Sequence, residues 1–312
     1  MSMTVLQSGV LSLLQDRGRF GFHRLGLTNG GPLDGEAFHY CNRLLQNAPG
    51  STAVEVSVGG LQLEAGVDTW LCLAGAAMPL SINGEPRALW AVHPVRAGDR
   101  IYIGHAKRGC RAYLGVADGF AIEPMFGSTA TVVREHIGGL RGERLQAGDV
   151  LPCAAVASRR RYFLAERDQP RYQTTLTVRV IPGYQQRHFS RRAQRRFFGE
   201  AFRVSERCDR MAYRLEGPPV ACGIDGILSE GICFGAIQIP PDGAPLVLLN
   251  DRQTIGGYPK IGAALSLDAA RLSQLVPGST VHFAPITPHT EQRALTLAQR
   301  FILSKPLQEG AA

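Results

Sequence analysis

Residues 53–104 have the sequence AVEVSVGGLQLEAGVDTWLCLAGAAMPLSINGEPRALWAVHPVRAGDRIYIG, in which short apolar runs alternate with glycine-containing turns. The turns are Gly59-Gly60, Asn83-Gly84 and Gly98-Asp99. Short apolar runs between such turns are typical of β-strands in a compact sheet. The runs cover residues 54–58, 70–73, 89–92 and 100–103, and a further one covers 112–116. We predict that this part of the chain forms a small closed or sandwich-like sheet.

The rest of the chain is also rich in strand-like runs and contains a few helices. Asp34 precedes apolar residues that recur at helical spacing, so we expect it to cap a helix. Residues 176–181 predict a strand, and helices are predicted near 190–198 and 268–275. A C-terminal helix is expected to have Thr287 as its N-cap and Pro288 at its first position.

Length and composition indicate two domains of mainly β structure with some α. The 312 residues are 45% hydrophobic, enough for two cores at roughly 150 residues each. The 36 glycines and 19 prolines favour a turn-rich, strand-based fold. Residues 157–174 are charged and lack periodicity. We therefore predict an N-terminal domain of residues 1–156, a linker of 157–174 and a C-terminal domain of 175–312.

The charge pattern limits the classes of partner. The formal net charge is +8, and of the 34 Lys and Arg residues only Lys107, Lys260 and Lys305 are lysines. Arginine preference is often a property of a GC-rich genome, and it also suits carboxylate or phosphate recognition. Basic and aromatic residues do not alternate along one stripe, so we expect no nucleic-acid partner. The N-terminus has no signal-peptide pattern and the longest uncharged stretch of interest, residues 69–84, is broken by glycine and proline. We expect a cytoplasmic protein without a membrane partner.

Several chemistries are excluded by missing motifs. No lysine follows glycine, so the chain has no Walker A loop, and no lysine follows methionine as in biotinylated proteins. The eight histidines and seven cysteines show no metal-ligand spacing, so no metal site is expected. A Gly-x-Ser-x-Gly nucleophile elbow is also absent.

The densest group of polar residues lies between positions 248 and 260, after an apolar strand. The sequence from position 249 is LNDRQTIGGYPK, in which Gly256 and Gly257 permit a bent loop. Lys260 is notable because the chain otherwise prefers arginine, whereas lysine offers a compact ammonium. A structural interpretation stays open, in which a Gly-Gly hairpin has Asp251 and Gln253 bonded to the backbone.

Further blocks accompany this loop. They are Gln15-Asp16-x-Gly18-Arg19, Gly30-Gly31-x-x-Asp34, Glu55 with Gly59-Gly60, Gly138-Gly139 to Gly148-Asp149, and Asp209-Arg210-Met211-x-Tyr213-Arg214-Leu215-Glu216-Gly217. With residues 248–260 they resemble the KipA family, also called allophanate hydrolase subunit 2 or the biotin-dependent carboxyltransferase family. The resemblance covers nearly the whole chain. Ala212 stands where the family usually has glycine, and Asp118 replaces a small residue.

The resemblance implies two cyclophilin-like β-barrel domains in tandem and a role in a complex. It implies the C-type subunit of an ATP-dependent 5-oxoprolinase, which converts 5-oxo-L-proline to L-glutamate, and a chain that is inactive alone. The implied partners are a KipI-like protein of the allophanate hydrolase subunit 1 type and a LamB/YcsF-like third subunit. ATP, with Mg, would act in the assembled complex on a small amide or lactam substrate.

If the chain acts as the resemblance implies, we expect three catalytic residues in the loop. Lys260 would be an electrostatic stabiliser or proton donor, and Asp251 a general base or orienter. Tyr258 is the third catalytic candidate, and it and Gln253 are expected to form hydrogen bonds with the substrate. A carboxylate clamp is expected from Arg210 or Arg214. Further candidate substrate-binding residues are Thr254, Tyr213, Glu230, Gln238, Gly256, Gly257, Gln15, Asp16, Arg19 and Asp34. For the four N-terminal residues, a purely structural role as loop and cap is an equal alternative.

Two other functions stay open. One is a urea carboxylase-like carboxyltransferase component, which would use biotin carried by another protein. The other is a KipA-type regulator that binds a KipI-like kinase inhibitor.

Overall fold

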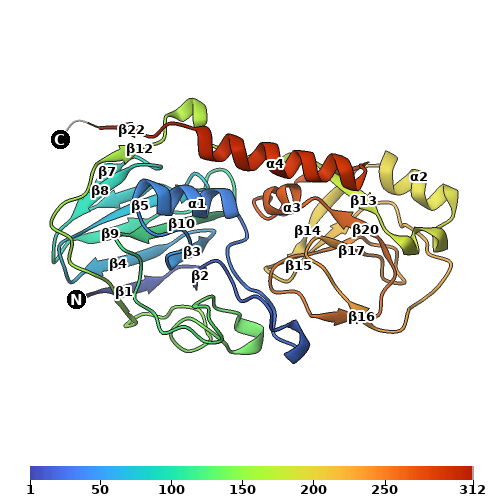
Figure 1. The fold of residues 1–312 in the computed structure, drawn as a ribbon, viewed down its shortest axis with the longest axis horizontal. Coiled ribbons are helices and arrows are strands. Elements are labelled where there is room, and N and C mark those ends of the chain that lie inside the picture. The colour runs from blue at the N-terminus through green and yellow to red at the C-terminus, as the bar shows by residue number, and fades with distance from the viewer. Residues whose placement is uncertain (311–312) are drawn as a thin grey trace. The chain divides into compact units, whose positions relative to one another are not determined.

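The computed structural model describes residues 1–310 and divides the chain into two compact units. Unit 1 comprises Met1–Phe20, Asn29–Tyr172 and the chain from Lys305 onward. Unit 2 comprises Gly21–Thr28 and Gln173–Ser304. In Figure 1 most of unit 1 is blue to green, and most of unit 2 is yellow to red. No helix among the described residues is long and apolar enough to cross a membrane.

Unit 1 is built from two antiparallel sheets around one core. The six-stranded sheet has the order β11 (Val150–Pro152), β1 (Ser2–Ser8), β4 (Leu61–Ala65), β9 (Arg100–Ile103), β6 (Leu80–Ile82) and β7 (Glu85–Arg87). The five-stranded sheet has the order β2 (Leu11–Gln15), β3 (Ala53–Ser57), β10 (Arg111–Val116), β5 (Thr69–Gly75) and β8 (Val92–Val95). Leu63 of the first sheet and Leu73 and Leu114 of the second belong to the same buried cluster. The strands expected at 54–58, 70–73 and 100–103 are present as β3, β5 and β9, whereas the run 89–92 shares only Val92 with the observed strand β8. The mainly β class is confirmed.

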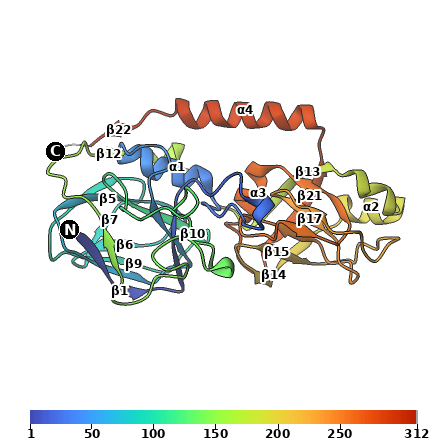
Figure 2. The same cartoon turned by 60° about the horizontal axis from the view of Figure 1, so that its bottom comes forward.

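Helix α1 (Gly35–Leu44) covers the five-stranded sheet of unit 1. It contacts β5 and β10, and Figure 2 shows it beside that sheet. All residues of β10 are buried because α1 covers its outer face and the core covers its inner face. The helix begins where predicted, since the Asp34 carboxylate accepts the backbone N–H of Ala37 at 3.1 Å.

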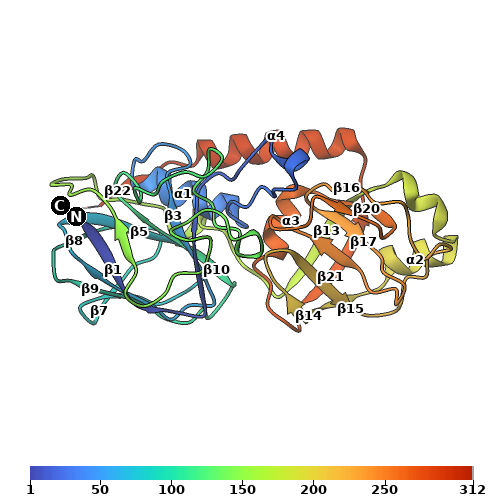
Figure 3. The ribbon, with the colours of Figure 1, turned by 90° about the horizontal axis from the view of Figure 1, so that it is seen from below.

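Unit 2 contains a closed barrel of seven strands. Its order is β13 (Thr175–Pro182), β20 (Lys260–Ala264), β17 (Ala236–Gln238), β18 (Leu246–Leu248), β15 (Ala212–Glu216), β14 (Phe202–Cys208) and β21 (Thr280–Pro285). Parallel pairing of β21 with β13 closes the barrel (Figure 3). A separate two-stranded ribbon pairs β16 (Glu230–Gly231) with β19 (Ile255–Gly256). This ribbon brings the predicted polar loop next to the barrel strands β17 and β20.

Three α-helices belong to unit 2. They are α2 (Arg191–Gly199), α3 (Ser266–Leu272) and α4 (Pro288–Ser304). Helix α2 buries Ala193 and Phe197, while its arginines lie outside this buried stripe. Helix α4 begins at Pro288 as predicted, and the Thr287 hydroxyl accepts the backbone N–H of Thr290 at 3.2 Å.

Short elements complete the chain. They are β12 (Tyr162–Phe163), β22 (Gln308–Glu309) and the 3-10 helices η1 (His23–Leu25), η2 (Val133–Glu135), η3 (Glu166–Asp168) and η4 (Tyr184–His188). Strands β12 and β22 pair within unit 1. The charged stretch 157–174 thus carries β12 and η3, and unit 2 resumes at Gln173.

Candidate functional site

The centre of the candidate site is an ion pair in unit 2 between Lys260 and Glu230. The ammonium of Lys260, at the start of β20, contacts Oε1 of Glu230, at the start of β16, and lies 3.3 Å from the carbonyl oxygen of Gly231. The lysine side chain is only 14% exposed. The backbone of Lys260 is also held, because its N–H donates to Oε1 of Gln185 at 2.7 Å. Both the backbone and the ammonium of Lys260 are therefore fixed.

Glu230 is held by two groups of helix η4 as well as by Lys260. The Gln185 amide donates to Oε1 of Glu230 at 2.8 Å, and the Tyr184 hydroxyl donates to Oε2. The Lys260 ammonium, followed by the Tyr184 hydroxyl, lowers the pKa of Glu230. The same carboxylate raises the pKa of Tyr184. Near neutral pH Glu230 is therefore a carboxylate and Tyr184 a neutral phenol.

Gln238 lies beside this cluster with an amide that has no partner. It is the β17 residue opposite Lys260 in the antiparallel register, and it is 1% exposed. Among residues 1–310, neither its Oε1 nor its Nε2 finds a hydrogen-bond partner. A buried amide without partners costs about 1–3 kcal/mol, so its presence requires an explanation.

Gly256 makes room for the Gln238 amide. A β-carbon at Gly256 would lie 2.8 Å from Nε2 of Gln238 and 2.3 Å from Cδ1 of Ile232. It would also lie 3.5 Å from Nε2 of Gln253. The two glutamine amides therefore lie near the same point of the backbone, and a β-carbon there would displace the ends of the neighbouring side chains. Gly256 in turn pairs with Glu230 in the ribbon.

A buried salt bridge holds the loop that leads into the ribbon. Nε and Nη2 of Arg210 donate to the two carboxylate oxygens of Asp251 at 2.9 and 3.0 Å. Both residues are buried, at 4% and 6% exposure. The sequence made Arg210 a candidate carboxylate clamp and Asp251 a candidate general base. In the structure the two side chains bind each other through this bidentate contact, and not a substrate.

Arg252 holds the same loop from its other side. Its Nε donates to the carbonyl of Ile232 at 3.1 Å and its Nη1 to the carbonyl of Leu249 at 3.2 Å. Burial lowers the pKa of Arg252. The contacts of Asp251 and Arg252 thus hold the part of the loop that directly precedes Gln253.

The remaining C-terminal candidates are dispersed around unit 2. The Tyr213 hydroxyl is buried and donates to the carbonyls of Ser273 and Leu275, so it serves the core. Arg214 pairs with Asp242. Tyr258 is 43% exposed. The remaining two, Thr254 and Gly257, lie in the loop, where their carbonyls accept the backbone N–H groups of Ile232 and Ile227.

The four N-terminal candidates lie in unit 1 and bind loops there. Gln15 donates to the carbonyl of Thr131 and accepts from Gly31, while Asp16 accepts from Gly18, Ser128 and Thr129. Arg19 donates to the carbonyls of Met125, Ser128 and Ala130. The second carboxylate oxygen of Asp34 accepts the Tyr172 hydroxyl at 2.8 Å. These contacts match the structural alternative of loop and cap.

The structure therefore brings together Lys260, Glu230, Gln238, Gly256 and Gln253. It adds residues that the sequence interpretation missed, namely Tyr184, Gln185 and Arg252. The available signal was the polar pair Tyr184-Gln185 directly after the strand end at Pro182-Gly183, a position where function often lies. Across residues 1–310, no three His, Cys, Asp or Glu side chains gather as metal ligands.

Comparison with known proteins agrees with this architecture. The family described as "Carboxyltransferase domain, subdomain A and B" matches residues 25–285. The chain is 32% identical to the C subunit of 5-oxoprolinase from Escherichia coli, covering 96% of both chains, and 34% identical to that of Haemophilus influenzae, covering 88% of both. The crystal structure of the K. lactis urea amidolyase superposes with a TM-score of 0.90 at 24% identity, over 99% of this chain and 20% of that chain.

The family match covers residues 25–285 of this chain. Each of the two bacterial relatives aligns with this chain over at least 88% of both sequences. The chain therefore belongs to the carboxyltransferase-domain family of subdomains A and B.

Proposed function

We propose that this chain is the C-type subunit of an ATP-dependent 5-oxoprolinase, which opens the lactam of 5-oxo-L-proline to L-glutamate. The two bacterial relatives of that name support the proposal. The observation that carries it is the buried, unpartnered amide of Gln238 beside the Lys260–Glu230 pair.

A lactam complements a carboxamide side chain. Its ring holds the peptide bond cis, so its N–H donor and C=O acceptor point the same way. The Oε1 and Nε2 of Gln238 offer one acceptor and one donor that are both free within residues 1–310. Both atoms are covered in this structure, so a substrate could reach them only after the residues around them had moved. Binding would then satisfy both atoms and remove the cost of leaving them unpaired, about 1–3 kcal/mol.

Lys260 provides the charge that ring opening requires. Activation of the lactam carbonyl places negative charge on its oxygen or on a phosphoryl group attached to it, and a nearby ammonium stabilises that charge. When water has added to the carbonyl carbon and the C–N bond breaks, the departing nitrogen must gain a proton. The Lys260 ammonium is a suitable donor, because Glu230 and the carbonyl of Gly231 hold it in place.

The other candidates act as positioning or contact residues in this proposal. Asp251 takes the role of orienter rather than general base, because Arg210 occupies both of its oxygens. Gln253, next to the Gln238 amide, and the exposed Tyr258 are proposed substrate contacts. Arg214 would have to leave Asp242 to clamp the substrate carboxylate.

The proposed reaction also requires ATP, Mg and partner subunits, which this chain would meet only in the assembled complex. The chain contains no Walker A sequence, so ATP with Mg would bind with the help of other subunits. We propose a KipI-like protein and a LamB/YcsF-like protein as the partners, with activity absent from this chain alone.

The test is glutamate release from 5-oxoproline by this chain mixed with both partner types, with and without ATP, and with each subunit omitted in turn. ATP-dependent release that requires this chain is expected. Absence of release from a verified assembly would contradict the proposal. Lys107→Ala is a matched control for Lys260→Ala, since Lys107 is an exposed lysine of unit 1.

A second function, a urea carboxylase-like carboxyltransferase, is favoured by one feature of the site. Urea also presents N–H and C=O groups on one side, so the Gln238 amide suits it as well. Biotin would be carried by another protein. Carboxylation of urea in the presence of a biotinylated carrier, with no glutamate released from 5-oxoproline, would select this alternative.

A further inference from the structure

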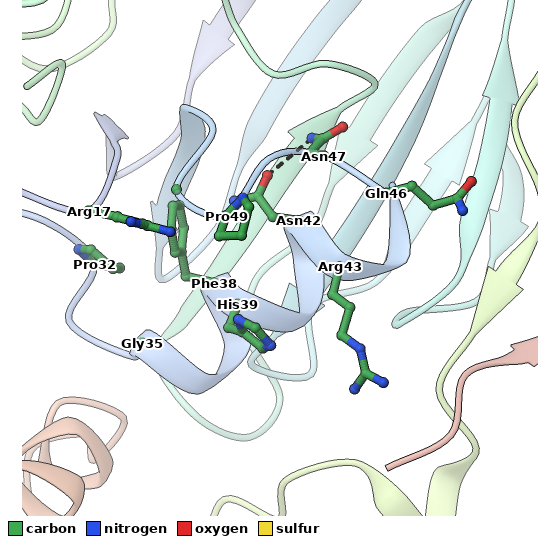
Figure 4. A pocket seen from close by; sticks show the side chains of 11 residues that line it. Arg17, Pro32, Gly35, Phe38, His39, Asn42, Arg43, Gln46, Asn47 and Pro49 are labelled. Carbon is green, nitrogen blue, oxygen red and sulfur yellow. Dashed lines mark hydrogen bonds between the residues drawn. The ribbon is translucent and has the colours of Figure 1, made fainter. Parts of the chain in front are cut away.

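A basic pocket in unit 1 lies on one face of helix α1, separate from the residues of the candidate site. It encloses about 430 Å³. Figure 4 shows its lining, with α1 on one side and the loops of Arg17, Pro32 and Pro49 on the other. The helix and its C-terminal end contribute Gly35, His39, Asn42, Arg43 and Gln46, which recur at helical spacing and so share one face.

The pocket carries positive charge without a matching carboxylate. Arg17, His39 and Arg43 line it, and none of the lining residues is acidic. An anion entering the pocket would therefore meet basic groups and no carboxylate of the lining.

Arg17 is exposed to solvent, and within residues 1–310 no protein group forms a hydrogen bond or an ion pair with its guanidinium. The guanidinium is therefore open to a ligand. The stem of the side chain is nevertheless packed, because a β-carbon at Gly50 would lie 2.4 Å from its Cγ. Because Gly50, at φ +91°, has no β-carbon, the side chain of Arg17 can cross the backbone at this position. This places the guanidinium of Arg17 at the pocket.

His39 also lines the pocket. Its Nε2 is buried and has no hydrogen-bond partner in the described chain. Burial, together with the charges of Arg43 and Arg17, lowers the pKa of His39. The imidazole is therefore neutral near neutral pH, and its covered Nε2 is not available to a ligand in this conformation.

Arg43 and the walls limit the kind of ligand. Arg43 is anchored by a 2.8 Å hydrogen bond from Nη2 to the carbonyl of Lys305. Phe38, Pro32 and Pro49 add apolar surface, as in pockets that bind small organic molecules. The volume also falls within the usual range of such pockets, roughly 300–1,000 Å³.

We propose that this pocket binds a small organic anion, with its carboxylate or phosphate group held by Arg17 and its apolar body against Phe38 and the two prolines. Arg43 adds positive charge to the same pocket. The site lies wholly in unit 1 and is independent of the reaction proposed for unit 2.

The test is isothermal titration of the full chain with inorganic phosphate, ADP, L-glutamate and 5-oxoproline. These probes separate phosphate from carboxylate as the preferred group. We expect at least one organic probe to bind and Arg17→Gln to weaken it at least about tenfold, the loss of one charge-assisted contact. The matched control is Arg87→Gln, which removes an exposed arginine of β7 in the same unit and should leave binding unchanged.

Three results would overturn the proposal. One is no binding of any probe at millimolar concentration to a chain with a normal melting transition. Another is an equal loss of affinity in Arg17→Gln and Arg87→Gln, because the effect would then be one of net charge. The third is binding that survives Arg17→Gln but disappears in Lys260→Ala, because the ligand would then occupy unit 2.

Discussion

Glu230 and Lys260 form an ion pair that joins the ribbon β16–β19 to the barrel strand β20. Gln185 completes a ring of contacts, since it accepts from the backbone of Lys260 and donates to the carboxylate of Glu230. A lysine on a flexible stem normally loses conformational freedom when it binds a ligand. Here the protein has already fixed the ammonium, so the site is organised before substrate arrives.

Replacing Lys260 by alanine should reduce glutamate release in the assembled complex by about a hundredfold or more, the usual effect of removing a stabiliser of developing charge. The measurement is steady-state turnover, with Lys107→Ala as control. Lys260→Arg should restore little activity, because a planar guanidinium does not fit the position of a compact ammonium. Full turnover by Lys260→Ala would show that this lysine has no catalytic role.

Replacing Gln238 by leucine should separate function from stability. The change removes an unpartnered buried amide, so the free energy of unfolding should stay constant or rise by about 1 kcal/mol. Turnover should nevertheless fall at least about tenfold, with a raised KM, because the substrate loses its amide partner.

Gln185→Leu is the matched control for Gln238→Leu. Its amide is satisfied, so the change should destabilise the protein by about 1–3 kcal/mol. Equal destabilisation by both leucine variants would mean that Gln238 has a structural partner, and would remove the observation behind the proposed function.

Replacing Glu230 by glutamine should change stability in a pH-dependent manner. The folded-state pKa of Glu230 is lowered, so its ionised form stabilises the fold above its unfolded-state pKa, and this contribution disappears as pH falls through the lowered value. The pair is partly exposed, so the difference from wild type near pH 7 should be at most about 1 kcal/mol.

Chemical unfolding at a series of pH values measures this difference, which should shrink as the solution is acidified. Glu64→Gln is a suitable control, because it breaks an exposed pair with Arg100 at 3.7 Å. A difference for Glu230→Gln that stays constant with pH would show that the ion pair does not stabilise the fold.

Breaking the Arg210–Asp251 pair on one side should cost about 3–5 kcal/mol, because a buried charge is left uncompensated. Asp251→Asn and Arg210→Met test the two sides, and the double variant should be less destabilised than the sum of the two. Additive losses would show that the contact is energetically unimportant. Turnover per folded molecule in Asp251→Asn then separates an orienting role from that of a base.

Replacing Gly256 by alanine should place a β-carbon against Cδ1 of Ile232 and cost about 1–3 kcal/mol through overpacking. Ile232→Val removes that methyl group, so the double variant should recover part of the loss. Thermal melting measures both. Failure of Ile232→Val to relieve Gly256→Ala would mean that the backbone at this position, rather than the side chain of Ile232, requires glycine.

Strands and helix starts that depend only on neighbouring residues could be predicted from the sequence. Alternating apolar runs and glycine turns produced the strands of residues 53–104, because side chains alternate between the two faces of a strand. Asp34 and Thr287 begin helices, since a side-chain oxygen can accept the free N–H groups of a first turn wherever the chain later folds. Lys260 also stood out in sequence, as a lysine in a chain that prefers arginine.

The partners of the polar residues were decided only by the tertiary structure. Asp251 pairs with Arg210, and Gln15, Asp16 and Arg19 hold loops of unit 1, because the barrel and the sheets bring distant segments into hydrogen-bonding distance. The type of a residue tells which hydrogen bonds and ion pairs its side chain can form. It does not tell which of them are already formed within the folded protein. That Gln238 stays unpartnered within residues 1–310, and that Tyr184 and Gln185 reach Glu230, depends on the register of β17 with β20 and of β16 with β19.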